Sequence, residues 1–149
     1  MTVIKSLKIG AALLLLCPAV ALASDRKSYG DVEVLEVVSI YDADTFRVNI
    51  AGWPDLIGKN ISIRADGFDA PEIRGKCQAE SEGAQIARDL TVNALEGADR
   101  VLLRNVRRGK YFRIIADVYI DGESLRDLHL SSGTARPYAG GKREGWCGL

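Results

Sequence analysis

The sequence IRADGFDAPE, residues 63–72, ends a β-strand and begins a stiff loop. Apolar and polar side chains alternate over residues 61–66, and this period of two is typical of a strand with one buried face. Gly67 interrupts the pattern, and Pro71 then fixes its own φ and favours an extended conformation for the residue before it. We therefore expect a strand over residues 60–66 that leads into a loop of restricted conformation.

This loop places two carboxylates, Asp69 and Glu72, a short distance from the guanidinium of Arg64. An exposed salt-bridge cluster is the simpler interpretation, because surface ion pairs are common and each contributes little to stability. A functional interpretation requires partners elsewhere in the chain.

Residues 1–23 have the pattern of a secretory signal peptide. Lys5 and Lys8 precede an apolar stretch, and the small-x-small sequence ending at Ala23 is a cleavage site. The uncharged stretch is shorter than a membrane span requires. Cys17 raises a lipoprotein alternative, but Leu16 is a poor residue before a lipoprotein cleavage site. We expect a secreted or periplasmic protein with one domain over residues 24–149.

Removal of residues 1–23 leaves 18 basic and 20 acidic residues, a formal net charge of −2. This balance is not that of a protein that coats nucleic acid, although the distribution of charge matters more than the sum. Basic residues cluster over 104–113 and 136–143, whereas acidic residues cluster over 42–44, 69–72 and 80–82. Basic patches beside an acidic pocket suit an anionic substrate bound next to a metal ion.

Two cysteines remain after cleavage, Cys77 and Cys147. An even count in an exported chain favours a disulfide, and two free thiols are the alternative. The bond would close a loop of about 70 residues and contribute roughly 4 kcal/mol on the chain-entropy estimate. It would also hold the C-terminal tail beside the loop that carries Asp69 and Glu72.

The rest of the chain predicts a small mainly β domain of the α+β class. Runs rich in β-branched residues or with alternating polarity predict five strands, over residues 31–40, 44–50, 60–66, 99–106 and 111–120. Helices are predicted over 80–96 and 124–133, the second with a capping-box-like start at Ser124. Residues 51–59 are predicted as a hairpin loop and 134–149 as irregular. This order matches a five-stranded Greek-key barrel with two helices, the OB-fold.

The periodicity also predicts which side chains are buried. The first helix has an apolar face formed by Ile86, Ala87, Leu90 and Ala94. The last strand has a core face formed by Phe112, Ile114, Ala116, Val118 and Ile120, with Tyr111 and Arg113 on the opposite face.

This arrangement brings several charged residues towards one end of the barrel. Aspartates with backbone carbonyls and water suit a hard cation such as calcium, and there is no Cys/His cluster to favour zinc. Two arginines can bind a phosphate and neutralise charge in a transition state, and a nearby glutamate can deprotonate water. The set suits metal-assisted hydrolysis of a phosphodiester. Its members are Asp44, Arg64, Asp69, Glu72 and Arg113.

Three motifs in this order resemble the staphylococcal nuclease (thermonuclease) family. They are Asp42-Ala43-Asp44-Thr45, the R-x(4)-D-x-P-E pattern from Arg64 to Glu72, and Tyr111-Phe112-Arg113 ahead of the turn at Asp121-Gly122. The resemblance extends from about residue 34 to residue 138. Ala43, Ala70, Gly109 and Phe112 are departures from it.

The resemblance implies a calcium-dependent OB-fold nuclease that hydrolyses DNA, RNA or both and leaves 3′-phosphate ends. Asp44, Asp69 and the backbone carbonyl of Ala70 would bind Ca²⁺, and Asp42 would support the ion through water. Glu72 would be the general base, and Arg64 and Arg113 would bind the scissile phosphate. Lys110 and Tyr111 would contact a terminal phosphate, and Tyr138 lies near the position of a base-contacting tyrosine.

Less specific interpretations stay open for single residues and for the whole domain. His129 is predicted to be structural or exposed, and Trp53 and Trp146 to pack or anchor loops rather than to stack on bases. Alternatives for the domain are a non-catalytic OB-fold binding module and a phosphodiesterase acting on a small substrate. We expect a monomer without stable membrane association.

Overall fold

The computed structural model describes residues 27–148. The predicted signal peptide over residues 1–23 lies outside this range. Within it, no helix is long and apolar enough to cross a membrane.

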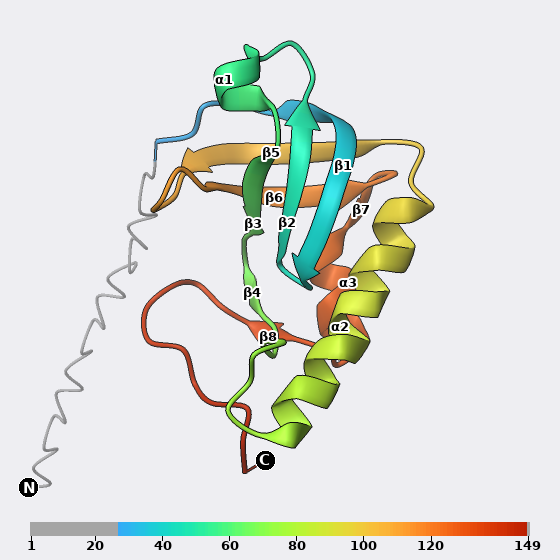
Figure 1. The fold of residues 1–149 in the computed structure, drawn as a ribbon, viewed down its shortest axis with the longest axis vertical. Coiled ribbons are helices and arrows are strands. Elements are labelled where there is room, and N and C mark those ends of the chain that lie inside the picture. The colour runs from blue at the N-terminus through green and yellow to red at the C-terminus, as the bar shows by residue number, and fades with distance from the viewer. Residues whose placement is uncertain (1–26, 149) are drawn as a thin grey trace, which may run out of the picture.

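Five strands close into a barrel, which confirms the predicted fold (Figure 1). Antiparallel pairs run in the order β3-β2-β1-β5-β6, and a parallel pair between β3 and β6 closes the sheet. Apolar side chains from all five strands fill the interior, with Phe46, Ile63 and Leu103 among the most deeply buried. The strands are β1 (Val32–Asp42), β2 (Thr45–Ile50), β3 (Ile61–Ala65), β5 (Val101–Arg108) and β6 (Ile114–Ile120).

Within residues 27–148, three helices and three short strands complete the structure. α2 (Gln78–Glu96) lies along β1 on the outside of the barrel, and α3 (Leu125–Ser131) begins where Ser124 accepts a hydrogen bond from the Asp127 backbone, as predicted (Figure 1). The prediction of two helices was incomplete, because α1 (Asp55–Gly58) forms one turn within the loop between β2 and β3. The short strands are β4 (Phe68–Asp69), β7 (Glu123–Ser124) and β8 (Arg136–Pro137).

The buried face of α2 agrees with the predicted one at Ala87 and Ala94 but not at Ile86. Ile86 is 63% exposed, whereas the fully buried apolar or uncharged positions are Ala84, Ala87, Thr91 and Leu95. Small side chains at the first of these positions allow the helix axis to approach the barrel closely. Helical spacing identified the helix, but it did not distinguish the side of the helix that packs from the side at Ile86 that faces solvent.

The start of β6 also differs from the prediction. Residues 111–113 precede the strand, and Tyr111 and Phe112 have φ of 55° and 62°, in the left-handed region. Phe112 is 62% exposed rather than buried, while Ile114, Ala116, Val118 and Ile120 do form the core face. The alternation continues through 111–113 in the sequence, but these residues form a tight turn in which the Gly109 N–H donates to the Arg113 carbonyl at 2.7 Å.

Candidate active site

Asp44 and Arg64 form a buried pair between two neighbouring strands. Asp44 ends the turn after β1 and is 2% exposed, and Arg64 lies on β3 opposite Thr45 of β2. Arg64 Nη1 donates to Asp44 Oδ1 at 2.8 Å, and Thr45 Oγ1 donates to the same oxygen at 2.9 Å. Burial raises the pKa of Asp44, with Arg64 and Thr45 acting in the opposite direction. The barrel itself therefore holds this carboxylate in place.

Asp42 links the same turn to the acidic loop, which we define as residues 66–73. Its Oδ1 accepts a hydrogen bond from the Ile73 N–H at 3.3 Å. Burial raises the pKa of Asp42, and the carboxylate of Glu72 adds to the effect, whereas the Ile73 N–H opposes it. Asp42 is thus close enough to Glu72 for the two charges to interact.

Asp69 and Ala70 are buried in the acidic loop, each 1% exposed. Asp69 belongs to β4, which pairs with β8 so that Asp69 lies opposite Arg136. Arg136 Nη2 donates to Asp69 Oδ2 at 3.0 Å, and Trp146 Nε1 donates to the same oxygen at 3.2 Å. The other oxygen, Oδ1, accepts from Arg143.

Arg143 reaches three members of the predicted site at once. Besides Asp69 Oδ1, its guanidinium donates to Glu72 Oε1 and, at 2.9 Å, to the backbone carbonyl of Ala70. Burial by itself lowers the pKa of Arg143, but Asp69 and Glu72 outweigh it and the pKa is raised. Glu72 stays half exposed, at 50% of its side chain.

Sequence reasoning did not identify Arg143, Arg136 or Trp146 as part of this site. All three lie beyond the last long element, in residues predicted to be irregular. The available signal was the pair of cysteines, which predicted that the C-terminal tail returns to the acidic loop.

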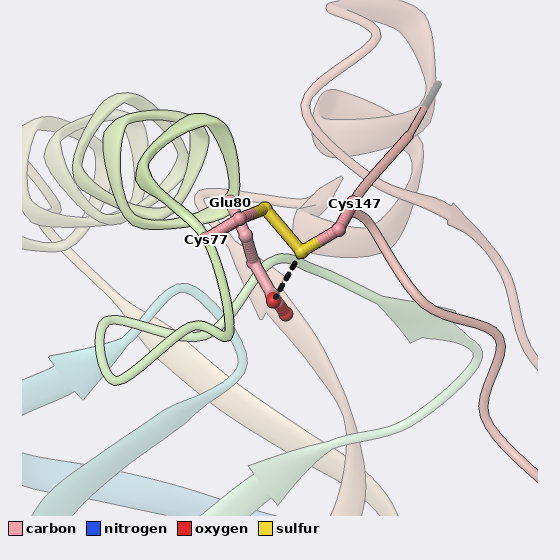
Figure 2. A group of neighbouring side chains, drawn as sticks. All are labelled: Cys77, Glu80 and Cys147. Carbon is pink, nitrogen blue, oxygen red and sulfur yellow. Dashed lines mark hydrogen bonds between the residues drawn. A yellow bond between two sulfur atoms is a disulfide. The ribbon is translucent and has the colours of Figure 1, made fainter.

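Cys77 and Cys147 meet at the N-terminal end of α2 (Figure 2). Their sulfur atoms are 2.18 Å apart and their Cα atoms 6.0 Å apart, across 70 positions of the chain. Glu80 lies beside them, accepts from the Lys76 N–H at 2.8 Å and lies 3.6 Å from the Cys147 sulfur. The contact between Cys77 and Cys147 places the tail residues 138–148 against the acidic loop.

A buried histidine, His129, supports the residues next to Asp44 and Asp69. His129 stacks on Phe68, the neighbour of Asp69, at 4.9 Å between ring centroids. Its Nε2 lies 2.8 Å from Thr91 Oγ1, which donates to the Ala43 carbonyl next to Asp44 at 2.9 Å. With the proton on Nε2, the neutral ring donates to Thr91 and leaves that hydroxyl free to donate to Ala43. His129 is therefore structural, as one of the two predicted alternatives stated.

The remaining predicted residues lie apart from this group. Arg113 directly precedes β6, whose Ile115 pairs with Arg64, and within residues 27–148 its guanidinium forms no hydrogen bond or ion pair. Lys110 and Tyr111 lie on the exposed turn, with Tyr111 94% exposed. Tyr138 donates from its hydroxyl to the Gly141 carbonyl at 2.8 Å and lines a hollow of about 690 Å³ with Arg107 and Arg126.

The donor atoms of the site fit a hard cation, but their arrangement includes an arginine. Carboxylate and carbonyl oxygens are the ligands that calcium prefers. In residues 27–148, however, no three of these carboxylates converge within 4.8 Å, and the group that does is Cys77, Glu80 and Cys147, whose two sulfur atoms lie at disulfide distance from each other. Arg143 lies among the oxygens of Asp69, Ala70 and Glu72 instead.

Comparison with known proteins gives a limited similarity to nucleases. No protein-family model matches the chain. The chain is 33% identical over 104 residues to the "Probable endonuclease lcl3" of Aspergillus flavus and, to the same extent, to the protein of that name in Aspergillus oryzae. Each alignment covers 57% of this chain and 37% of the relative, so the chain spans little more than a third of the length of these curated relatives.

Proposed function

We propose that this protein is an exported, calcium-dependent nuclease of the staphylococcal nuclease type, which hydrolyses phosphodiester bonds of DNA, RNA or both. The observation that carries the proposal is the buried Asp44–Arg64 pair held next to the acidic loop of Asp69, Ala70 and Glu72 on a closed five-stranded barrel. The similarity to proteins named as probable endonucleases supports the same reaction class.

Each polar group has a distinct role in this proposal. Asp44, Asp69 and the Ala70 carbonyl would hold Ca²⁺, and Asp42 would hold a water of its coordination shell. When bound, the ion supplies Lewis-acid stabilisation of the phosphoryl oxygens. Arg64 and Arg113 bind the scissile phosphate and neutralise charge that develops on it. Lys110 and Tyr111 contact a terminal phosphate, and Tyr138 contacts a base.

Glu72 acts as the general base. It takes a proton from a water molecule whose oxygen attacks phosphorus in line with the 5′-oxygen. The bond from phosphorus to the 5′-oxygen breaks, and this oxygen leaves with a proton from solvent. The products are a 3′-phosphate and a 5′-hydroxyl.

Export and the disulfide belong to the same proposal. Cleavage after Ala23 would release the domain of residues 24–149 to the periplasm or the medium as a monomer. The Cys77–Cys147 bond would form there, because such compartments are oxidising.

One observation favours a different class, a non-catalytic OB-fold module that binds nucleic acid. Arg143 is paired with both Glu72 and Asp69, so the proposed base and a proposed ion ligand are neutralised within the chain. The two functions differ in one measurable property, because a binding module retains DNA without cleaving it.

The test is hydrolysis of single-stranded DNA by the exported protein, with calcium and then with excess chelator. We expect cleavage that requires calcium and falls by about 10²–10⁴-fold in Glu72→Gln and Arg113→Ala, the range for loss of a general base or a charge-stabilising group. Arg74→Gln is the matched control, since it removes an exposed charge two positions from Glu72. Retention of DNA without cleavage by the folded wild-type protein would instead support the binding module.

A further inference from the structure

The Arg143 guanidinium occupies two of the oxygen ligands that the proposed function assigns to calcium, and it also contacts the proposed general base. It donates to a carboxylate oxygen of Asp69, to the Ala70 carbonyl and to Glu72. Asp69 is almost completely buried, and a buried carboxylate requires a partner that replaces its hydration. Arg143 satisfies that requirement from within the chain.

The tail that carries Arg143 is held at several points. Arg136 donates to the backbone carbonyls of Glu144 and Gly145 and lies 4.2 Å from the ring of Trp146. Cys147 then joins the tail to Cys77 at the start of α2 (Figure 2). These contacts hold the residues that directly follow Arg143, and its own hydrogen bonds place it on the acidic loop.

We propose that Arg143 is an internal counter-cation of the metal site: it occupies two of the calcium ligands, Asp69 and the Ala70 carbonyl, in the metal-free protein, and the ion binds only when Arg143 leaves. This inference rests on the proposed calcium site. It adds a residue that controls when that site is available.

The two cations exclude each other for a geometric reason. Calcium binds oxygen atoms directly, at about 2.3–2.6 Å, through the lone pairs that accept hydrogen bonds. Arg143 N–H groups already use such lone pairs on Asp69 and Ala70. Arg136 and Trp146 bind the other Asp69 oxygen, Oδ2, and can stay in place when Arg143 moves.

The competition lowers the apparent affinity for calcium. Only the fraction of molecules in which Arg143 has left can bind the ion, so the apparent dissociation constant is the intrinsic one divided by that fraction. The disulfide keeps the guanidinium at a high effective concentration near its partners. Its loss should therefore increase the affinity for calcium.

The test is isothermal titration of Ca²⁺ into the wild-type protein and two charge variants. Arg143→Gln removes the counter-cation, and Lys142→Gln removes the same charge from the adjacent, exposed position. We expect Arg143→Gln to bind calcium at least about tenfold more tightly than wild type, and Lys142→Gln to stay within about twofold. Equal affinities of wild type and Arg143→Gln, or an equal gain in Lys142→Gln, would overturn the proposal.

The tether is tested with Cys77→Ser/Cys147→Ser. We expect this double variant to bind calcium more tightly than wild type, and to have no effect on affinity when Arg143→Gln is already present. An equal gain in the Arg143→Gln background would show that the bond acts by some route other than Arg143, which would overturn the role of the tether.

A measurement on the wild-type protein avoids dependence on variants that fold poorly. The ¹⁵Nε–Hε signal of Arg143 should be protected from exchange with solvent in the calcium-free protein and lose that protection at saturating calcium. Protection that persists in the bound state would overturn the proposal. Asp44→Asn distinguishes failure of the proposed calcium site from failure of the counter-cation proposal. Unchanged calcium binding in Asp44→Asn would contradict the calcium site itself. Loss of calcium binding in Asp44→Asn, together with no gain in affinity in Arg143→Gln, would contradict only the counter-cation.

Discussion

Asp44 and Asp69 are equally buried, but different parts of the chain neutralise them. Asp44 is paired with Arg64 and Thr45, which lie on adjacent strands of the barrel. Asp69 is paired with Arg136, Arg143 and Trp146, all of which come from the C-terminal part of the chain, 67 or more positions away. One half of the site is therefore built by strand pairing and the other by a returning tail.

The difference shows that two equally buried aspartates can depend on different parts of the fold for their partners. The environment of Asp44 exists wherever β2 and β3 pair. The environment of Asp69 exists only while residues 136–147 lie against the acidic loop. His129 and Thr91 connect the two halves, because His129 stacks on Phe68 beside Asp69 and Thr91 donates to the Ala43 carbonyl beside Asp44.

The largest expected effect comes from removing the tether of the tail half. Cys77→Ser/Cys147→Ser should lower the free energy of unfolding by up to about 4 kcal/mol, the chain-entropy estimate for a loop of this length. Urea denaturation of the oxidised wild type and the variant measures it. Amide exchange should increase in the tail and acidic loop but not around Asp44. Equal loosening around Asp44 would contradict the independence of the two halves.

The second effect compares the two aspartates directly. Asp69→Asn should cost about 3 kcal/mol, because it leaves two arginines without their carboxylate. Asp44→Asn should cost less, because it leaves only one arginine, Arg64, without this carboxylate partner. Denaturant midpoints of both variants, with and without the cysteines, form a double-mutant cycle. Only the cost of Asp69→Asn should shrink when the disulfide is absent.

The third effect tests the support that the halves share. Burial lowers the pKa of His129 to about 4, below the value of about 6.5 expected for an unfolded histidine. The unfolded state therefore takes up a proton first, so stability should fall as pH decreases from about 6.5 to about 4 and level off below, by about 3 kcal/mol in total.

The measurement is the free energy of unfolding from pH 7 to pH 3.5 in wild type and His129→Gln. The difference between the two curves removes contributions from the carboxylates. A difference that does not change with pH would show that His129 has the same pKa in the folded and unfolded states, as an exposed histidine would.

The smallest effect concerns the turn of residues 109–113, which carries Arg113. The described side chains of this turn contact neither half of the candidate site. Phe112→Ser should change the stability by less than about 0.5 kcal/mol, as expected for an exposed side chain outside the core. Its contact with the Arg108 guanidinium, at 4.3 Å from the ring, is exposed and weak. A loss above about 2 kcal/mol, measured by thermal unfolding, would show that Phe112 packs in the core as the alternation predicted.

The barrel and one half of the site follow from local patterns in the sequence. Alternation over 61–66 placed Arg64 on the outer face of β3 and its apolar neighbours in the core, as the structure has them. The same pattern was wrong for Phe112, because a tight turn with positive φ interrupts the strand at a point where polarity still alternates. The helical spacing of α2 was wrong for Ile86, because spacing alone does not distinguish an apolar side that packs on the barrel from one that faces solvent.

The sequence by itself determined the five-stranded barrel, the capped start of α3 and the positions of Asp44, Arg64, Asp69 and Glu72 along the chain. Side-chain period, turn residues and motif spacing are local properties, and they can be recognised without knowing what packs against them. Only the tertiary structure decided that Arg143 lies on Asp69, Ala70 and Glu72. That contact joins residues more than 70 positions apart, and the buried carboxylate it neutralises exists only after the chain has folded around it.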